Sequence, residues 1–162
     1  MSGTSPRTAA QRTADALALL TTPAVDAWVA SAGVVDGVVR AHLVPLSLVW
    51  VDGRVVIAIA AKSVTARNLR AQGTARLGVG PTRDVVMIDA VVERVVPVAE
   101  APVALADAYA AQADWDPRAD HDYAYVVLRP ERVQAWRESD ELSGRTIMRD
   151  GTWVVRPGPD PS

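Results

Sequence analysis

Residues 55–79 read VVIAIAAKSVTARNLRAQGTARLGV, and this stretch predicts a strand, a short helix and a second strand. The apolar, β-branched run at 55–61 is typical of a strand that is covered on both faces. A helix is expected over about 63–71, and residues 75–79 form the second predicted strand. The polar residues are concentrated at the strand-to-helix junction, which is therefore the candidate binding site in this stretch.

The junction combines hydroxyls and cations at a predicted helix start. Lys62 is the only lysine in the chain, and Ser63, Thr65, Arg67 and Arg70 follow it. Ser63 can cap the helix by accepting a hydrogen bond from a first-turn N–H group. The remaining N–H groups at the positive end of the helix dipole then favour an anion such as a phosphate monoester. The same pattern also fits an ordinary cap followed by solvated arginines, and the spacing alone leaves both interpretations open.

The composition of the chain limits its possible domain number, binding partners and metal sites. The chain has 162 residues, 49% of them hydrophobic, with a formal net charge of −2 and no cysteine. Such a length predicts one domain with a substantial core. The balanced charge gives no reason to expect a nucleic-acid or membrane partner. Without cysteine there are no disulfides or thiolate metal sites, and His42 and His121 alone offer little for a metal. No signal peptide or membrane span is recognisable, so a cytoplasmic location is expected.

Valine-rich segments separated by turn residues dominate the rest of the chain. Strands are predicted over 25–32, 38–51, 55–61, 75–79, 85–96 and 123–133, with a last hairpin formed by 145–148 and 153–156. Asp-Gly pairs between strand-like runs are strong hairpin signals, and hairpins imply an antiparallel sheet. Helices are expected over 13–20 and 101–113. The pattern therefore predicts a mainly β, antiparallel barrel at 13–157, with a disordered arm at 1–12 and a flexible tail at 158–162.

Four segments in this order resemble the flavin-binding split-barrel family, whose namesake is pyridoxamine 5′-phosphate oxidase and which includes flavin- and deazaflavin-dependent reductases. They are HLVPL at 42–46, KSVTARNL at 62–69, RDVVMI at 83–88, and AW at 135–136 followed by RTIM at 145–148. The resemblance covers about residues 25–156. It implies an antiparallel split β-barrel of the Greek-key, FMN-binding type.

The resemblance also implies a function and a site. An oxidoreductase that uses FMN, or alternatively the deazaflavin F420, on a small-molecule substrate is expected, and it should form a homodimer with shared cofactor sites. The turn at 62–69 would hold the cofactor phosphate, and a tryptophan and an arginine would reach the flavin from the partner subunit. The implied cofactor-binding residues are Leu43, Val44, Pro45, Ala60, Lys62, Ser63, Thr65, Arg67, Asn68, Asp84, Trp136 and Arg145. No catalytic residue is nominated, because the cofactor carries the chemistry in such enzymes.

Departures from the oxidases argue against pyridoxamine phosphate as the substrate. Glu141-Leu142-Ser143 stands where the oxidases have an Arg-Leu-His that binds the pyridoxal compound. Tyr109 matches a phosphate-binding tyrosine, but Ala113 stands in place of an arginine. A dianion left without cationic partners would be desolvated at high cost. Asp84 replaces a glutamine that reaches the flavin ring, and its charge would disfavour an anionic reduced flavin unless it is protonated or paired with Arg83.

Several interpretations stay open from the sequence alone. A split barrel that binds flavin or haem for storage or sensing, without turnover, is the alternative to an enzyme, and a ligand-free interaction module is a third reading. His42 is interpreted as a structural histidine in preference to a ring contact. Pro45 in mid-strand indicates an edge, a bulge or a strand whose neighbour is replaced by a ligand. Trp50, Trp115 and Trp153 are expected to pack in the core or hairpins, while Trp136 fits packing and flavin cover equally.

Overall fold

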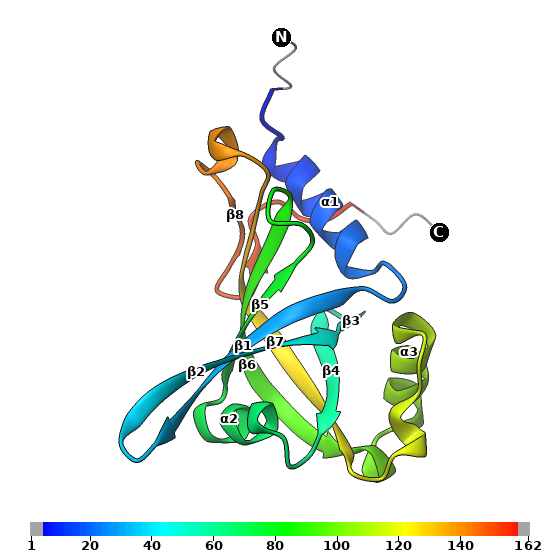
Figure 1. Ribbon diagram of the computed structural model, residues 1–162. Helices are drawn as coiled ribbons and strands as arrows, with labels where there is room; N and C mark the ends of the chain where they lie inside the picture. The colour runs from blue at the N-terminus through cyan, green and yellow to red at the C-terminus, as the bar shows by residue number, and fades with distance from the viewer. Residues whose placement is uncertain (1–4, 159–162) are drawn as a thin grey trace.

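The computed structural model describes residues 5–158, which form a nine-stranded antiparallel sheet and three α-helices (Figure 1). The strands are β1 (Asp26–Val35), β2 (Val38–Ser47), β3 (Val49–Val51), β4 (Arg54–Ala60), β5 (Thr74–Val79), β6 (Val85–Pro97), β7 (Tyr123–Trp136), β8 (Thr146–Arg149) and β9 (Thr152–Trp153). The helices are α1 (Ala9–Leu20), α2 (Val64–Gln72) and α3 (Val103–Ala113), and the short 3-10 turns are η1 (Val98–Glu100), η2 (Pro117–Ala119) and η3 (Ser139–Glu141). The predicted antiparallel β class is confirmed, because every strand pairing is antiparallel.

The sheet curls into a barrel that is not closed by hydrogen bonds. Its strands run in the order β2-β1-β5-β6-β7-β4-β3, with β8 and β9 added beside β7. The edge strand β2 lies next to β4 without pairing with it, so a seam remains between the two (Figure 1). Pro45 lies in this edge strand, where it costs no ladder hydrogen bond, as one of the sequence-based interpretations expected. Within residues 5–158 no helix is long and apolar enough to cross a membrane.

Three Asp-Gly pairs close three of the hairpins, as predicted from the sequence. Each aspartate and each glycine at 36–37, 52–53 and 150–151 has a positive φ angle. Positive φ at both central residues is the type I′ turn, whose twist matches that of the flanking strands. These turns fix the register of β1 with β2, β3 with β4 and β8 with β9.

Two hydrophobic clusters fill the molecule without a phenylalanine. The larger cluster lies inside the barrel and includes Ile57, Leu77 and Ile88 from the sheet. The smaller cluster lies under α3, where the rings of Tyr109 and Tyr125 pack with centroids 5.3 Å apart. Trp50 and Trp153 pack against the larger cluster and against each other at 6.4 Å, which confirms their predicted packing role. Their tilted rings join the β3–β4 hairpin to the β8–β9 hairpin.

The first helix begins earlier than the sequence predicted. Thr8 and Gln11 form a capping box, in which each side chain binds the other residue's backbone N–H, so α1 begins at Ala9 instead of residue 13. The predicted disordered arm at 1–12 is therefore wrong for 9–12; residues 1–4 lie outside the described residues. Residues 159–162 of the predicted tail also lie outside them.

The segment before α1 is fastened by an ion pair. Arg7 donates its Nε and Nη2 to the two carboxylate oxygens of Glu141, at 3.0 and 2.7 Å, and its backbone N–H donates to the same group at 2.9 Å. Glu141 is only 3% exposed and also accepts from the backbone N–H of Arg137. These bonds, first of all the side-chain bond from Arg7, lower the pKa of Glu141 to about 2. The charge of Glu141, which stands where the oxidases have an arginine, is therefore already matched by Arg7.

We expect Arg7→Ala to lower the free energy of unfolding by about 3 kcal/mol, because it leaves a buried carboxylate without its cation. Arg54→Ala, which removes an exposed ion pair with Glu93, should cost under about 1 kcal/mol. Denaturant titrations measure both values. Equal losses in the two variants would contradict the role given to Arg7.

The same pair predicts a pH dependence. The pKa of Glu141 lies below its value of 4.5 in an unfolded chain, so the pair stabilises the fold fully above about pH 4.5 and progressively less as the pH falls toward about 2. Glu141→Gln should flatten the loss of stability over this range.

Candidate cofactor site

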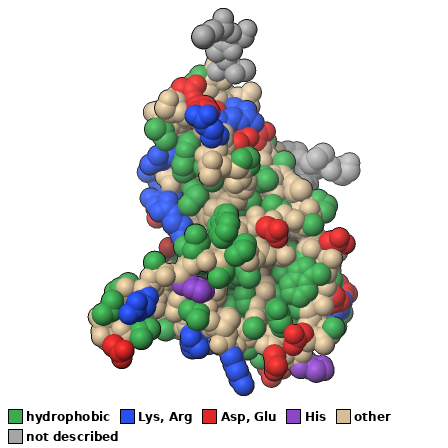
Figure 2. Space-filling model, in the orientation of Figure 1, with side chains coloured by type: hydrophobic (Ala, Val, Ile, Leu, Met, Phe, Trp, Pro, Cys, Tyr) green, Lys and Arg blue, Asp and Glu red, His purple; other side chains and the backbone are tan. Residues whose placement is uncertain are grey.

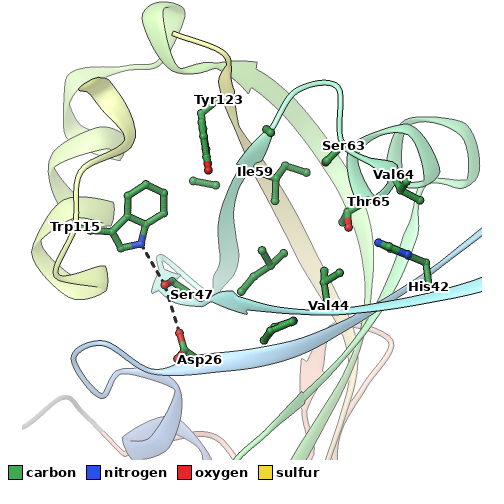
Figure 3. Close-up of a pocket in the computed structure, with 14 residues that line it drawn as sticks. Asp26, His42, Val44, Ser47, Ile59, Ser63, Val64, Thr65, Trp115 and Tyr123 are labelled. Atoms are coloured by element: carbon green, nitrogen blue, oxygen red, sulfur yellow. Dashed lines mark hydrogen bonds between the residues drawn. The ribbon is translucent and has the colours of Figure 1, made fainter. Parts of the chain in front are cut away.

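The seam between β2 and β4 opens into a cavity of about 640 Å³. Figure 3 shows it between β2, the end of β4, the start of α2 and the segment that follows α3. Its lining residues are Asp26, His42, Val44, Pro45, Leu46, Ser47, Ala58, Ile59, Ala60, Ser63, Val64, Thr65, Trp115 and Tyr123. The sequence-predicted residues Val44, Pro45, Ala60, Ser63 and Thr65 are thus brought together from three elements.

The register of the β1–β2 hairpin determines what β2 offers to this cavity. In a type I′ hairpin the residues that flank the turn, here Val35 and Val38, form a hydrogen-bonded pair, and such pairs alternate along the ladder. Leu43, Pro45 and Ser47 then occupy non-hydrogen-bonded positions opposite β1. Their backbone groups point to the free edge of the strand, toward the seam. An edge of this kind can hydrogen-bond a planar ligand that lies where a further strand would pair.

One end of the cavity is formed by the first turn of α2. Ser63 has the extended backbone of an N-cap, and its Oγ accepts a hydrogen bond from the backbone N–H of Ala66 at 3.1 Å, as predicted. Thr65 is buried, and its hydroxyl lies at this end (Figure 3). His42 extends from β2 toward the same turn (Figure 3), so it lines the cavity and is not only a packing residue as the sequence interpretation favoured.

Cations surround this turn from outside the cavity. Lys62, Arg67 and Arg70 are exposed and do not line the cavity. The guanidinium of Arg67 donates to the carbonyl of Lys62 at 3.5 Å, and that of Arg70 donates to the carbonyl of Ala61 at 2.5 Å. Arg70, for which the sequence leaves a site role and a surface role equally open, is therefore folded back onto the turn. The three cations make the end of the cavity near α2 electropositive.

Two further predicted residues do not line the cavity. Leu43 lies on the outer face of β2 and is 58% exposed. Asn68 is buried, and its Nδ2 donates to Ser31 Oγ on β1 at 3.1 Å. A Cβ added at Gly33 would lie 2.4 Å from the Asn68 side-chain oxygen, so the amide fills the space that this glycine leaves. Asn68 thereby fastens α2 to β1.

Asp84, Trp136 and Arg145 do not line this cavity. The guanidinium of Arg145 lies over the Trp136 ring, 5.2 Å from its centroid. Asp84 is paired with Arg137 at 3.1 Å, whereas Arg83 pairs with Glu138, so the considered pairing of Asp84 with Arg83 is wrong.

The opposite end of the cavity contains residues that the sequence reading missed. Trp115 donates its Nε1–H to Ser47 Oγ at 3.2 Å, and Ser47 Oγ donates to Asp26 at 3.4 Å (Figure 3). The Trp115 ring also packs edge-on against Tyr109 at 5.7 Å, so its predicted packing role is confirmed in addition. Ser47 lies 21 positions from Asp26 and 68 positions from Trp115 in the sequence. No local sequence pattern therefore identifies the three as a group.

Comparison with solved structures identifies proteins of the same fold. An F420 reductase is 19% identical, with a TM-score of 0.55 over 72% of this chain and 93% of that chain. A protein related to general stress protein 26, of the pyridoxinephosphate oxidase family, from Clostridium acetobutylicum is 11% identical, with a TM-score of 0.55 over 79% and 89%. A heme-binding protein from Mycobacterium smegmatis is 21% identical, with a TM-score of 0.59 over 90% of this chain but only 59% of its own length.

These likenesses confirm the predicted split-barrel fold of the pyridoxamine 5′-phosphate oxidase type. No family model matches the sequence, and no curated protein matches it. At such identities the similarity concerns the fold, and the chemistry must be argued from the site.

We expect Gly33→Ala to destabilise the protein by ~1–3 kcal/mol, because the added methyl group displaces the Asn68 amide. In an Asn68→Ala background the same change should cost less than half as much. Gly158→Ala, whose added methyl group meets no atom within 4 Å, is the matched control. Denaturant melts of the double-mutant cycle give the coupling, and simple additivity would show that Asn68 does not fill this space.

Proposed function

We propose that this protein is an oxidoreductase that binds FMN, or alternatively F420, in the cavity between β2 and β4. The observation that carries the proposal is the combination of an electropositive helix start at one end of the cavity with a free strand edge along its side. Helix N-termini with hydroxyl groups bind phosphate, and an edge strand offers main-chain donors and acceptors to a flat ring. The cavity volume of about 640 Å³ falls within the usual range of about 300–1,000 Å³ for small-ligand sites.

The residues divide by the part of the cofactor that they would hold. Ser63 and Thr65 would bind the phosphate through their hydroxyls and the free amides of α2, and Lys62 and Arg67 would neutralise it. The backbone of β2 around Pro45 would face the ring. A bound flavin or deazaflavin supplies the hydride chemistry, while the protein orients the ring and excludes water from it.

FMN and F420 both present a phosphate, so this end of the cavity fits either. The F420 reductase among the similar structures supports the alternative, and the exposed Arg67 and Arg70 border the turn where an anionic tail would leave the cavity. A cofactor that stays bound through purification would be FMN, whereas F420 would act as a dissociable cosubstrate.

A flavin- or haem-binding protein without turnover is the second candidate function. His42 lines the cavity, and imidazole is a common haem ligand. The heme-binding protein from Mycobacterium smegmatis has a similar fold. The absorption spectrum of the purified protein, followed by assays for consumption of reduced nicotinamide or reduced F420 with an added acceptor, tests both functions. A colourless protein that binds neither FMN, F420 nor haem would refute them.

We further propose a two-fold homodimer formed through the outer face of the sheet. Trp28 is 55% exposed on this face, beside Pro45 on β2 and Gly78 on β5. The projecting β1–β2 hairpin adds exposed valines, of which Val39 is 71% exposed, and hydrophobic side chains gather along it in Figure 2. Apolar surface of this kind is typical of an interface, and closed dimers are the commonest solution. In such a dimer Trp136 and Arg145 would lie against the partner's cofactor.

We expect Lys62→Ala and Arg67→Ala each to weaken FMN or F420 binding by ~1.5–3 kcal/mol, because each removes a cation from the phosphate. Arg94→Ala, which removes an exposed arginine from β6 that does not line the cavity, should leave the affinity unchanged. Titration of cofactor-free protein gives the dissociation constants. Unchanged affinity in both turn variants would exclude this phosphate site.

Shared sites predict complementation between damaged chains. A Trp136→Ala chain carries an intact phosphate turn, and an Arg67→Ala chain carries an intact tryptophan, so a mixed dimer contains one undamaged site. Mixing the two after mild denaturation should therefore restore part of the cofactor binding. Light scattering that shows a cofactor-binding monomer at micromolar concentration would contradict the arrangement.

A further inference from the structure

We propose that the end of the cavity opposite α2 binds an uncharged or cationic aromatic group and excludes anionic ones. The proposal rests on the proposed function, since the occupant of this end would be the substrate presented to the cofactor. It goes beyond that function by naming the substrate class. The supporting observations are the charged groups and the aromatic side chains at this end of the cavity.

The charge at this end is negative. Asp26 is the only carboxylate among the fourteen lining residues of the described chain, and none of them is arginine or lysine. The segment 114–122, which follows α3 and contributes Trp115 to the wall, contains four aspartates and a single arginine. That arginine, Arg118, is already bound to Asp116 and Asp107. The C-terminal end of α3 adds the negative pole of a helix dipole.

The aromatic rings at this end contact one another and β2. Trp115 is held by its hydrogen bond to Ser47 and by edge-on contacts with Tyr109 and Tyr123, whose ring centroids lie 5.7 and 5.9 Å away. Trp115 remains 38% exposed, and the Tyr123 hydroxyl points into the cavity (Figure 3). Aromatic faces bind other rings and cations, whereas an anion near them and near Asp26 is repelled.

The Trp115 end of the cavity is also unsuited to the phosphate of pyridoxamine phosphate. A phosphate at the Trp115 end would find no cation among the lining residues described and would lie near Asp26. Glu141 does not contribute to the repulsion of this phosphate, because its charge is matched by Arg7.

Three probes with one ring system test the proposal: 2-naphthylmethylammonium, 2-naphthalenemethanol and 2-naphthoate. Calorimetric titration of the FMN-saturated protein should show the cation binding about tenfold more tightly than the carboxylate, with the alcohol between them. Asp26→Asn should narrow the ratio of cation to carboxylate affinity about threefold without changing the affinity for the alcohol. Asp36→Asn, at the distant hairpin turn, should leave all three affinities unchanged.

Trp115→Phe keeps an aromatic ring but removes the indole and should weaken all three probes about equally. Binding of 2-naphthoate as tight as that of the cation, or failure of all three probes to bind at millimolar concentration, would overturn the proposal. Titrations of the cofactor-free protein with FMN and with the same probes separate the two proposals. A protein that fails to bind FMN yet discriminates the probes by charge contradicts only the proposed cofactor.

Discussion

The unpaired edge of β2 is the constraint on which the site depends. A sheet that curls far enough to bring β2 beside β4, but does not hydrogen-bond them, leaves backbone donors and acceptors along a seam. Buried backbone groups need partners, so a seam of this kind must be hydrated or filled by a ligand. Pro45 has no backbone N–H, so the free edge has one donor fewer that needs a partner. The cavity therefore follows from the strand order itself, and the side chains decide only what it accepts.

Local signals were sufficient to predict the strands and most of the fold. Asp-Gly pairs require positive φ angles, and they produced type I′ hairpins at 36–37, 52–53 and 150–151. Ser63 was identified as the cap of α2 because capping acts over three residues. The start of α1 was missed even though its signal is local: Thr8 with Gln11 is a capping box, hidden among Ser, Thr, Pro and Arg residues that resemble a disordered arm.

Interactions between distant residues could not be predicted in the same way. Glu141 accepts from Arg7 across 134 positions, and nothing near either residue distinguishes this pair from solvated charges. The sequence therefore predicts only that Glu141 replaces a family arginine, and it gives no sign that Arg7 pairs with it. Trp115 and Ser47 meet across 68 positions, so the wall of the cavity opposite α2 forms only when the segment after α3 folds against the end of β2. The phosphate turn, by contrast, is contiguous in sequence and was recognised there.

The two ends of the cavity have opposite polarity, and this polarity orients any bound molecule. The N-terminal pole of α2 and the cations Lys62, Arg67 and Arg70 lie at one end, whereas Asp26 and the C-terminal pole of α3 lie at the other. A ligand with one anionic group is thus stabilised in one direction and destabilised in the reverse direction. The helix dipoles are fixed in direction by the backbone, so they act on any group bound within the terminal turn of either helix. The direction in which a ligand lies is therefore set by the charges at the two ends of the cavity. Which ring binds is set by the β2 edge and the side chains along the seam.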